Sequence, residues 1–431
     1  MDFKGVRARQ VGQADLYGRS KRRTLRVLSE SPLNAEPPDV AELLQYPITP
    51  RRLIYKRNHS DIKDVKADAG VKEPAFNITI DGEVDRDLSI SFQDLVNQFS
   101  RKEVVAALQC AGNRRAQMAE KTQRDVKGLK WNEGAVSNVK WGGVLLRDVL
   151  LYAGIPTNCD DLHVCLASHI APCEQDTYYG VSIPIEKVMD EGGDVLLAYE
   201  MNDEPLTPEH GFPLRIVVPG FSGARWVKWI DRITVSRNES PNFYQQRDYK
   251  VLPDTVISHD MADAQDWWSR VPAIQAIALN SVVATVQRVP SVITNITNVS
   301  PYTHGHVTPD VGRIVLRATG YALSGTRITK VDISADSGKN WVPAQITYQE
   351  GKWSWSLWEG DIAVSASNTA NGINGINGEN GHNTENGVAT KRVVTVWSRA
   401  QDESGDVQVT ECAWNLRGVG FCAVGERQVE I

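Results

Sequence analysis

One cysteine of this 431-residue chain lies in a setting that favours chemistry. Cys110 follows the short apolar run 104–108 and precedes Arg114 and Arg115. Backbone amides and cationic side chains near a thiol lower its pKa and stabilise the thiolate, which attacks electrophiles and binds metal ions. A free cysteine is otherwise most often a small buried apolar side chain. The two adjacent arginines favour the functional alternative, because a buried guanidinium group needs an anion beside it.

Cationic side chains recur in two other segments of the chain. They are Arg57, Arg215, Arg225 and Lys228. The last three lie within the stretch 205–230, where proline, glycine and apolar residues surround them and predict partial burial. A guanidinium group can pair with two oxygens of one anion. Because the chain as a whole carries a net charge of −6, this local enrichment indicates a receptor for an oxyanion or a phosphate.

A second set of residues has the chemistry of zinc ligands. It consists of His163, Cys165, His169 and Cys173. Zinc sites usually present paired ligands at short spacings, whereas His163 and Cys165 share one face of a predicted strand and Cys173 lies well beyond them. We interpret these residues as incidental, and a non-catalytic, zinc-holding interaction protein is the alternative from another class.

Trp131 is unusual among the twelve tryptophans. It follows the polar stretch 127–130, which does not resemble a hydrophobic core. This context is compatible with a pocket wall and equally with ordinary packing.

The first elements that would position Cys110 are predicted from hydrophobic periodicity. Residues 76–84 alternate as in a hairpin with a tight turn, and Ser91 has the form of a cap that opens a helix. The run 104–108 is short, apolar and partly β-branched, which predicts a buried strand. Cys110 is therefore expected just beyond a strand end.

The next part of the chain continues to mix strands and helices. A turn at 141–143 is expected to open a helix that ends at Gly154. Strand and helix patterns alternate up to about residue 240. This pattern predicts an α+β fold class with a mixed α/β domain.

Beyond about residue 310 the helical period disappears and alternating apolar positions replace it. Short strands separated by turns predict a β-sandwich of the immunoglobulin-like kind. An insert at 363–390 repeats asparagine at every third position and predicts a disordered hairpin loop between two strands. We therefore divide the chain into an N-terminal arm at 1–50 and domains at 51–265 and 266–431.

Composition sets outer limits on function and location. The chain has 47 Lys and Arg against 53 Asp and Glu, so no nucleic acid or membrane partner is expected. No apolar run approaches the roughly 20 residues of a membrane span. Six cysteines in so long a chain indicate a reducing compartment. The N-terminus does not resemble a secretory signal, and we expect an intracellular, soluble protein, with the cytoplasm favoured over mitochondria or peroxisomes.

Several motifs of the chain resemble the sulfite oxidase family of molybdenum enzymes. In chain order, five of them are Tyr55-Lys-Arg-Asn-His59, Leu108-Gln-Cys-Ala-Gly-Asn-Arg-Arg115, Leu197-Ala-Tyr-Glu-Met-Asn202, His210-Gly-Phe-Pro-Leu-Arg215 and Gly223-Ala-Arg-Trp-Val-Lys-Trp229. Three more resemble the family's dimerisation domain, namely Gly320-Tyr-Ala-Leu-Ser-Gly325, Val331-Asp-Ile-Ser334 and Trp414-Asn-Leu-Arg-Gly418. The resemblance implies a molybdopterin-binding domain of the sulfite oxidase fold at 51–265, an immunoglobulin-like dimerisation domain at 266–431, and a homodimer.

The resemblance also implies a molybdenum-molybdopterin cofactor and assigns roles to residues. Cys110 would be the thiolate ligand of the molybdenum. The residues implied to hold the cofactor are Tyr55, Arg57, Asn58, His59, His210, Arg215, Arg225, Trp226, Val227 and Lys228. The residues implied to form the substrate pocket are Arg57, Arg115, Trp131, Tyr199 and Arg417.

The implied activity is the oxidation of sulfite to sulfate by oxygen-atom transfer. The sequence contains no His-Pro-Gly-Gly haem motif, so no haem is expected in this chain and electrons would pass to oxygen or to a separate acceptor protein. Nitrate reductases and other oxo-transfer molybdenum enzymes share the cysteine motif and are the nearest alternative. Arg417 favours sulfite, since nitrate reductases usually carry an apolar residue at that position of the motif.

Overall fold

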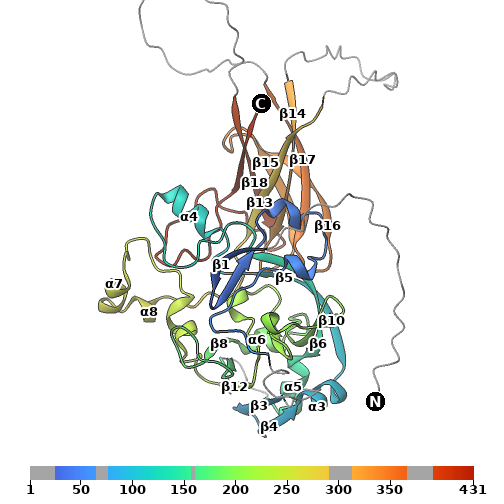
Figure 1. The fold of residues 1–431 in the computed structure, drawn as a ribbon, viewed down its shortest axis with the longest axis vertical. Helices are drawn as coiled ribbons and strands as arrows, with labels where there is room; N and C mark the ends of the chain where they lie inside the picture. Colours follow the sequence, from blue (N-terminus) through green and yellow to red (C-terminus); the bar gives the residue numbers. More distant parts are fainter. Residues whose placement is uncertain (1–24, 65–75, 157–160, 291–312, 366–391) are drawn as a thin grey trace, which may run out of the picture.

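The computed structural model describes residues 25–64, 76–156, 161–290, 313–365 and 392–431. Figure 1 shows a mixed α/β part below an upright, all-β part that contains the C-terminus. The predicted fold class, a mixed α/β fold followed by a β-sandwich, is confirmed. No helix among the described residues is long and apolar enough to cross a membrane.

The first sheet of the mixed part carries the strand that leads to Cys110. Its strands are β5 (Arg101–Gln109), β6 (Val136–Leu145), β9 (Leu196–Met201), β10 (Glu204–Pro205) and β11 (Arg215–Val217). The order is β10-β9-β6-β5, with β11 also paired to β9, and the pairs are antiparallel. Ala106, Ala107 and Leu108 are buried, which confirms the predicted buried strand.

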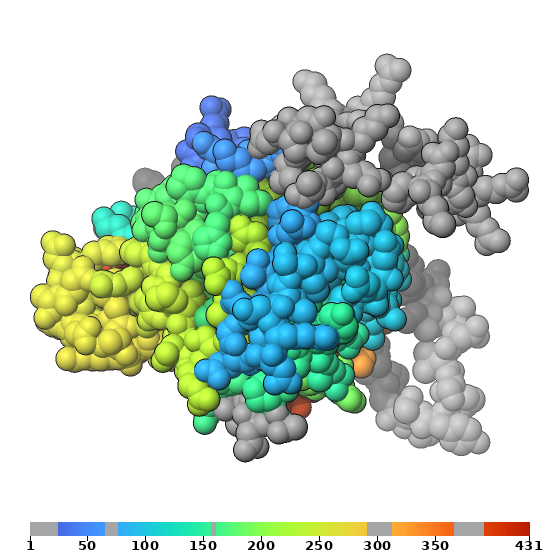
Figure 2. Space-filling model, turned by 90° about the horizontal axis from the view of Figure 1, so that it is seen from below, coloured from blue at the N-terminus to red at the C-terminus, as the bar shows by residue number. Residues whose placement is uncertain are grey.

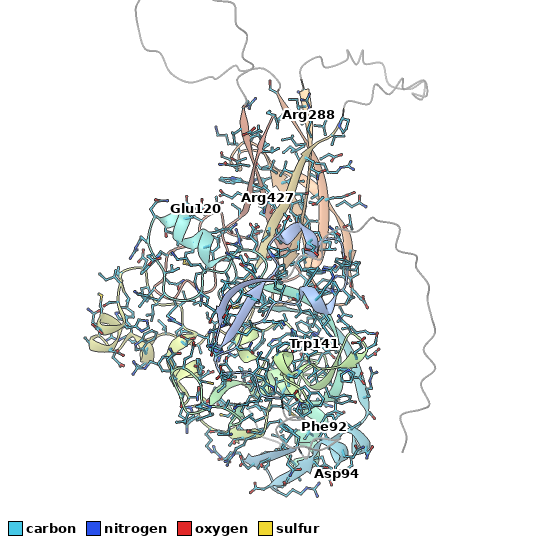
Figure 3. All side chains as sticks on the ribbon, viewed as in Figure 1. Phe92, Asp94, Glu120, Trp141, Arg288 and Arg427 are labelled. Atoms are coloured by element: carbon cyan, nitrogen blue, oxygen red, sulfur yellow. The ribbon has the colours of Figure 1, made fainter. Side chains whose placement is uncertain are left out.

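The second sheet mixes parallel and antiparallel pairs. Its order is β4 (Leu88–Ser91), β3 (Asn77–Gly82), β12 (Arg232–Ser236), β7 (His163–Ser168) and β8 (Tyr179–Pro184). Only the β12–β3 pair is parallel. Apolar side chains of both sheets form one continuous core, to which the fully buried Trp141 belongs (Figure 3).

Short helices and turns cover these sheets. They are α1 (Val40–Leu43), η1 (Arg51–Leu53), α3 (Phe92–Gln98), α4 (Arg115–Thr122), α5 (Leu146–Ala153), α6 (Ile185–Met189), η2 (Pro208–His210), η3 (Gly223–Arg225), η4 (Tyr244–Asp248), α7 (His259–Ala264) and α8 (Trp267–Arg270). In Figure 2 the yellow segment that contains α7 and α8 forms a lobe at one side of the molecule. The Ser91 hydroxyl accepts a hydrogen bond from the Asp94 amide at 3.0 Å, which confirms the predicted cap of α3.

The β-sandwich consists of seven strands in one path. They are β13 (Asn280–Arg288), β14 (Arg313–Leu323), β17 (Ser356–Ser365), β16 (Val342–Gln349), β15 (Ile328–Ser334), β18 (Val393–Asp402) and β19 (Gly425–Glu430). Side chains along β18 alternate between buried and more exposed positions, as expected for a strand with one face in a core. Arg427 of β19 pairs with Glu133 of the mixed part at 2.8 Å and lies near the junction in Figure 3.

Three local predictions need correction. Residues 141–143 do not form a turn but lie inside β6, and the following helix begins only at Leu146. Tertiary pairing with β5 and β9 holds the glycine-containing segment in an extended state that its local sequence does not favour. The predicted end of this helix at Gly154 is confirmed by its left-handed backbone.

The second correction concerns the hairpin β3–β4. The hairpin exists, but residues 83–87 form a wider connection than a tight turn.

The third correction concerns the loop that would hold the asparagine-rich insert. Strand β17 pairs with β14 and β16, and β18 pairs with β15 and β19, so the connection between β17 and β18 is not a hairpin. Most of the insert, residues 366–390, lies outside the described residues.

The described part of the N-terminal segment forms a hairpin and a short helix against both parts of the molecule. Strands β1 (Arg26–Glu30) and β2 (Leu33–Glu36) pair with each other, and Glu36 accepts hydrogen bonds from the Asn132 amide at 3.1 Å. Farther along, the Pro47 carbonyl accepts hydrogen bonds from Asn138 at 2.9 Å and from the Trp355 indole at 3.0 Å. The segment thereby links β6 to the β-sandwich.

Candidate active site

Cys110 occupies a rigid turn directly after β5. Its amide donates to the Ala135 carbonyl at 3.0 Å, and its carbonyl accepts from the Asn113 amide at 2.9 Å. The Gly112 amide lies 3.4 Å from the Cys110 sulfur and donates to it. Strand pairing and the turn therefore fix the direction of the thiol, which faces a pocket and is buried from solvent.

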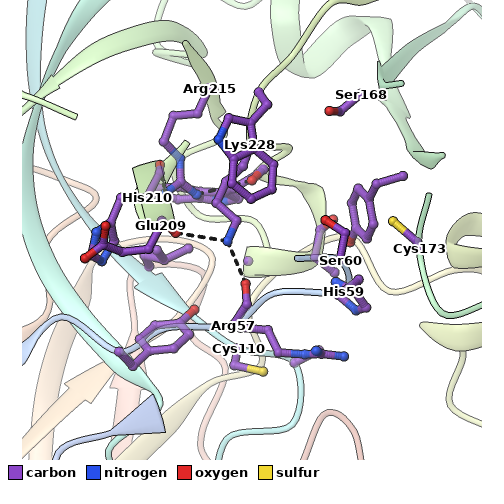
Figure 4. Close-up of a pocket in the computed structure, with 18 of the residues that line it drawn as sticks. Arg57, His59, Ser60, Cys110, Ser168, Cys173, Glu209, His210, Arg215 and Lys228 are labelled. Carbon is purple, nitrogen blue, oxygen red and sulfur yellow. Dashed lines mark hydrogen bonds between the residues drawn. The ribbon is translucent and has the colours of Figure 1, made fainter. Parts of the chain in front are cut away.

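The pocket gathers residues from widely separated parts of the chain (Figure 4). Eight residues of the predicted site line it, namely Tyr55, Arg57, His59, Cys110, His210, Arg215, Trp226 and Lys228. The residues that sequence analysis did not assign are Ser60, Leu108, Ala111, Ser168, Ala171, Cys173, Tyr179, Glu209, Gly223, Ala224, Trp229 and Tyr249. Four separate motifs thus meet in one cavity, beside one sulfur atom.

Cations of this pocket are bonded to neutral oxygens. The Lys228 ammonium donates to the Arg57 carbonyl at 2.8 Å and to the Glu209 carbonyl at 3.1 Å, and it contacts the Asn58 side-chain oxygen. Arg215 donates to the carbonyls of His210 at 3.1 Å and Trp226 at 3.2 Å. In the described parts of the chain, no carboxylate lies within ion-pairing distance of Arg57, Arg215 or Lys228.

This arrangement has a direct electrostatic consequence. Burial, together with Arg215 and Arg57, holds the pKa of Lys228 well below its ordinary value. Burial alone lowers the pKa of Arg215 to about 10. Like charges crowded in a dry site are costly unless an anion neutralises them. The pocket therefore fits an anionic ligand such as a phosphate-bearing cofactor.

Two neutral histidines complete the wall. The His210 ring bonds Thr207 through Nδ1 at 2.7 Å, while its buried Nε2 has no protein partner. Burial lowers the pKa of His210 to about 3, and Lys228 and Arg215 act in the same direction. Burial and Arg57 likewise hold the pKa of His59 well below its ordinary value. A buried polar nitrogen without a partner indicates that a bound group supplies one.

The protonation of Cys110 differs from expectation. Burial raises the pKa of its thiol, and Arg115 and Arg57 only oppose that rise. The prediction of a lowered pKa was wrong because desolvation outweighs the two guanidinium groups. A thiolate at this position therefore needs a directly bound positive partner, and a metal ion provides one.

Arg115 and Arg417 approach the same region from opposite ends of the chain. The Arg115 side chain donates to the carbonyls of Arg417 at 3.0 Å and Gly418 at 3.1 Å. Gly418 has a positive φ of 56°, and a Cβ there would lie 2.7 Å from the Arg115 side chain. Arg417 forms an ion pair with Asp248. Burial lowers the pKa of Arg115 to about 10, Arg417 and Arg57 act in the same direction, and Cys110 opposes them, so these groups are electrostatic neighbours. Of the three arginines, Arg57 lines the cavity itself.

Besides Asn58, Arg115 and Arg417, four residues of the predicted site do not line the cavity. Tyr199 on β9 packs edge-on against Phe92, with ring centroids 5.9 Å apart, because strand alternation turns it away. Trp131 is fully buried, and its ring centroid lies 6.2 Å from that of Tyr55, so it supports the wall from behind.

The other two serve the backbone around the pocket. Arg225 donates to the Ile274 carbonyl at 2.7 Å and to Gln245. The Val227 carbonyl accepts from the Ile216 amide at 2.7 Å. Asn58 is also absent from the cavity wall but reaches it indirectly, through its contact with Lys228.

Tyr249 is the principal residue that sequence analysis missed. It follows the single π-helical turn η4, a rare conformation that often marks functional sites. Its hydroxyl lies 2.8 Å from His59 Nε2 and faces the pocket. Burial, aided by Asp248 and Cys110 against Arg57, raises the pKa of Tyr249, so the hydroxyl keeps its proton. The only sequence signal is the stretch 248–250, which places an acid, a tyrosine and a lysine together, and all three are buried.

The candidate zinc ligands are not assembled into a site. Among the described residues, no three His, Cys, Asp or Glu side chains form a cluster that could hold a metal ion. His169 stacks on Tyr178 and bonds Asp231, whereas Cys173 lines the pocket. A metal at Cys110 would therefore need most of its ligands from a cofactor.

Comparisons with known proteins agree with this geometry. The family described as "Oxidoreductase molybdopterin binding domain" matches residues 63–244, and the family described as "Mo-co oxidoreductase dimerisation domain" matches residues 272–376. The chain is 37% identical to the sulfite oxidase of Gallus gallus over 92% of this chain and 75% of that protein. It is 35% identical to the sulfite oxidase of Arabidopsis thaliana over 92% of this chain and 91% of that protein. The crystal structure of the sulfane dehydrogenase SoxCD from Paracoccus pantotrophus superposes with a TM-score of 0.67 at 26% identity, covering 98% of this chain and 93% of that one.

The unpaired cations predict that the unloaded protein is unstable. Protein produced without the molybdenum cofactor should unfold at least about 5 °C below the loaded protein, because its buried like charges lack an anion. Sodium phosphate should recover part of this difference by binding among the cations, whereas sodium chloride of equal ionic strength should recover little. Calorimetry of both forms in both salts measures the effect. Identical midpoints for the two forms would contradict the anion-binding interpretation.

Proposed function

The chain belongs to the sulfite oxidase family of molybdenum oxidoreductases, and from this membership we propose that it oxidises sulfite to sulfate. The single observation that carries the proposal is the Cys110 sulfur beside a cluster of buried cations that, within the described segments, have no carboxylate partner. When bound, the molybdenum-molybdopterin cofactor supplies oxygen-atom transfer and takes up the two electrons. The protein supplies binding, orientation and electrostatics.

We assign cofactor binding to the inner part of the pocket. The Cys110 thiolate would ligate the metal, and its fixed turn sets the direction of that bond. Lys228 and Arg215 would neutralise the cofactor's anionic groups. The free Nε2 of His210 would donate or accept the hydrogen bond that the protein itself leaves unmade. Each of these groups is positioned by backbone hydrogen bonds before any ligand arrives.

Substrate binding falls to the arginines around Cys110. Arg57, Arg115 and Arg417 present three positive charges, which suits a doubly charged oxyanion. Arg115 is held by carbonyls and serves as a fixed donor. Arg417 is only partly buried and pairs with Asp248, so sulfite would compete with that carboxylate for its guanidinium group.

Tyr249, which directly follows the Asp248 partner of Arg417, would also orient the substrate. Because the pKa of His59 is lowered and that of Tyr249 is raised, both groups are neutral near pH 7. The Tyr249 hydroxyl can therefore exchange its bond to His59 for a hydrogen bond to an anion without moving a net charge. Burial of these groups also limits the access of water.

We further propose a homodimer that passes its electrons to oxygen or to a separate acceptor protein. The match of residues 272–376 to a dimerisation domain supports the dimer. Arg417 supports sulfite over nitrate as substrate. Sulfite carries two negative charges and nitrate only one, and a cation at this position would attract the doubly charged ion more strongly.

Metal content and activity test the proposal together. The purified protein should contain close to one molybdenum per chain and should reduce ferricyanide in the presence of sulfite. Cys110→Ser should abolish this activity, whereas Cys165→Ser, a change in β7 of the second sheet, should not. Nitrate reduction with a reduced viologen and no sulfite turnover would identify the nitrate alternative instead. Zinc without molybdenum or pterin would support the zinc-holding alternative.

Arg417→Met tests the role of the outermost arginine. Removing a charge-assisted hydrogen bond of about 1.5–3 kcal/mol should raise KM for sulfite about 10- to 100-fold and change kcat less. Arg237→Met removes a cation of the same type from an exposed pair with Glu83 and serves as the control. Steady-state kinetics at constant ionic strength measure both. An unchanged KM in Arg417→Met would refute the assigned role.

Two tyrosine variants separate the sequence-based assignment from the observed geometry. Tyr249→Phe should lower kcat/KM for sulfite about tenfold through the loss of one hydrogen bond, and Tyr199→Phe should leave it unchanged. Each variant removes one hydroxyl and keeps the ring, so the pair is matched for stability. The opposite ranking of the two variants would return the substrate role to Tyr199.

A further inference from the structure

Two cysteines outside the pocket lie unusually close to each other. The Cys412 and Cys422 sulfurs are 3.7 Å apart, and both side chains are partly exposed. Both are free, and Cys422 donates a weak hydrogen bond to the Cys412 sulfur. A disulfide bond requires the sulfurs to approach to about 2.05 Å, so only a small movement separates this pair from a covalent link.

The segment between them carries Arg417. Its backbone is anchored on both sides of Arg417. The Gly420 amide donates to the carbonyl of the pocket residue Ala111 at 2.8 Å, and the Leu416 carbonyl accepts from the Lys127 amide at 2.8 Å. Asn415 closes the segment internally through hydrogen bonds with Val419 at 2.9 and 3.1 Å. The two cysteines are therefore the ends of a loop that holds an arginine and two carbonyl partners of Arg115.

We propose that Cys412 and Cys422 form a redox-active dithiol that a hydroperoxide oxidises to a disulfide, closing the Arg417 loop covalently. The Cys412 thiolate attacks the terminal peroxide oxygen; a sulfur–oxygen bond forms, the oxygen–oxygen bond breaks, and an alcohol or water leaves. Cys422 then attacks the Cys412 sulfur, the sulfur–sulfur bond forms, and the sulfenic oxygen leaves as water. The two sulfurs lose two electrons and the peroxide gains two.

The electrostatics distinguish the attacking sulfur from the resolving one. The hydrogen bond from Cys422 lowers the pKa of the Cys412 thiol, and the nearby Arg114 acts in the same direction. The shared hydrogen bond raises the pKa of Cys422. The opposite directions of these shifts favour Cys412 as the attacking sulfur and Cys422 as the resolving one. Arg114 is fixed there by hydrogen bonds to the carbonyls of Ala423 at 2.7 Å and Val424 at 3.1 Å.

The proposed function provides a source of peroxide. Only this source rests on the proposed function, and the oxidation of the dithiol does not. Two-electron reduction of oxygen, one of the two proposed electron acceptors, yields hydrogen peroxide. The dithiol would then respond to the enzyme's own turnover. Its chemistry can be tested independently with added peroxide.

Peptide mapping of the whole protein tests the dithiol directly. The loaded enzyme is treated with limiting hydrogen peroxide, its remaining thiols are alkylated, and it is digested with trypsin without reduction. Because trypsin cleaves after Arg417, the peptides 400–417 and 418–427 should stay joined only through the disulfide and should separate on reduction. Cys412→Ser and Cys422→Ser should each abolish the joined species, and Cys165→Ser should retain it. Absence of the joined peptides from peroxide-treated wild-type protein would overturn the proposal.

A second measurement tests whether the link acts on the loop. Oxidised wild-type enzyme should show a KM for sulfite at least threefold different from that of the reduced enzyme, and Cys422→Ser should show no such response. Joined peptides with an unchanged KM would overturn the effect on Arg417 and leave the disulfide in place. Failure of the untreated enzyme to oxidise sulfite would count against the proposed function but not against the dithiol, which the peptide map reports separately.

Discussion

The organisation of this protein depends on the burial of several positive charges around one sulfur atom. Arg57, Arg215 and Lys228 donate to carbonyl and amide oxygens, and no carboxylate in the described residues neutralises them. Such a cluster is unfavourable by itself, since each charge loses its hydration and repels the others. The fold must therefore hold it rigidly, and a bound anion must offset its cost. The same features that make the pocket costly when unloaded make it selective for an anionic group.

Backbone geometry provides the rigid frame. Strand β5 leads directly into the Cys110 turn, and the next residues bind the β-sandwich: Asn113 bonds Tyr321 at 3.1 Å and Arg114 bonds Asn280 at 2.8 Å. Arg215 begins β11 and forms an isolated bridge with Lys228, and Arg57 follows η1. Arg215 and Lys228 are anchored by hydrogen bonds to carbonyl oxygens. Burial also keeps His59 and Tyr249 uncharged, so the charges of the pocket come from its lysine and arginine side chains and from Glu209, which pairs with Lys56. The charge states of the pocket residues thus follow from their burial away from water.

Residues of the pocket could be predicted from the sequence when both the residue type and its local sequence context were informative. Cys110 could be predicted because an apolar strand ends beside it, and Arg215 and Lys228 because cations within apolar stretches imply burial. The direction of a side chain from a strand could not be predicted, and Tyr199 was therefore assigned to a pocket that it does not face. Tyr249 was missed because a π-helical turn, which has no simple sequence pattern, delivers it. The strand β6 was partly mistaken for a turn because pairing on both sides overrides the local preference of its glycines.

The position of Arg417 shows why the two parts of the molecule depend on each other. The chain leaves the mixed part, builds most of the β-sandwich, and then returns between β18 and β19 to place residues 412–422 against the Cys110 turn. Arg115, whose side chain ends in this returning loop, cannot satisfy its guanidinium group without the carbonyls of Arg417 and Gly418. Displacing the loop would leave a buried charge unpaired, which is far more costly than the loss of an exposed contact. Docking of the sandwich is therefore a condition for the positions of both Arg115 and Arg417 beside the Cys110 turn.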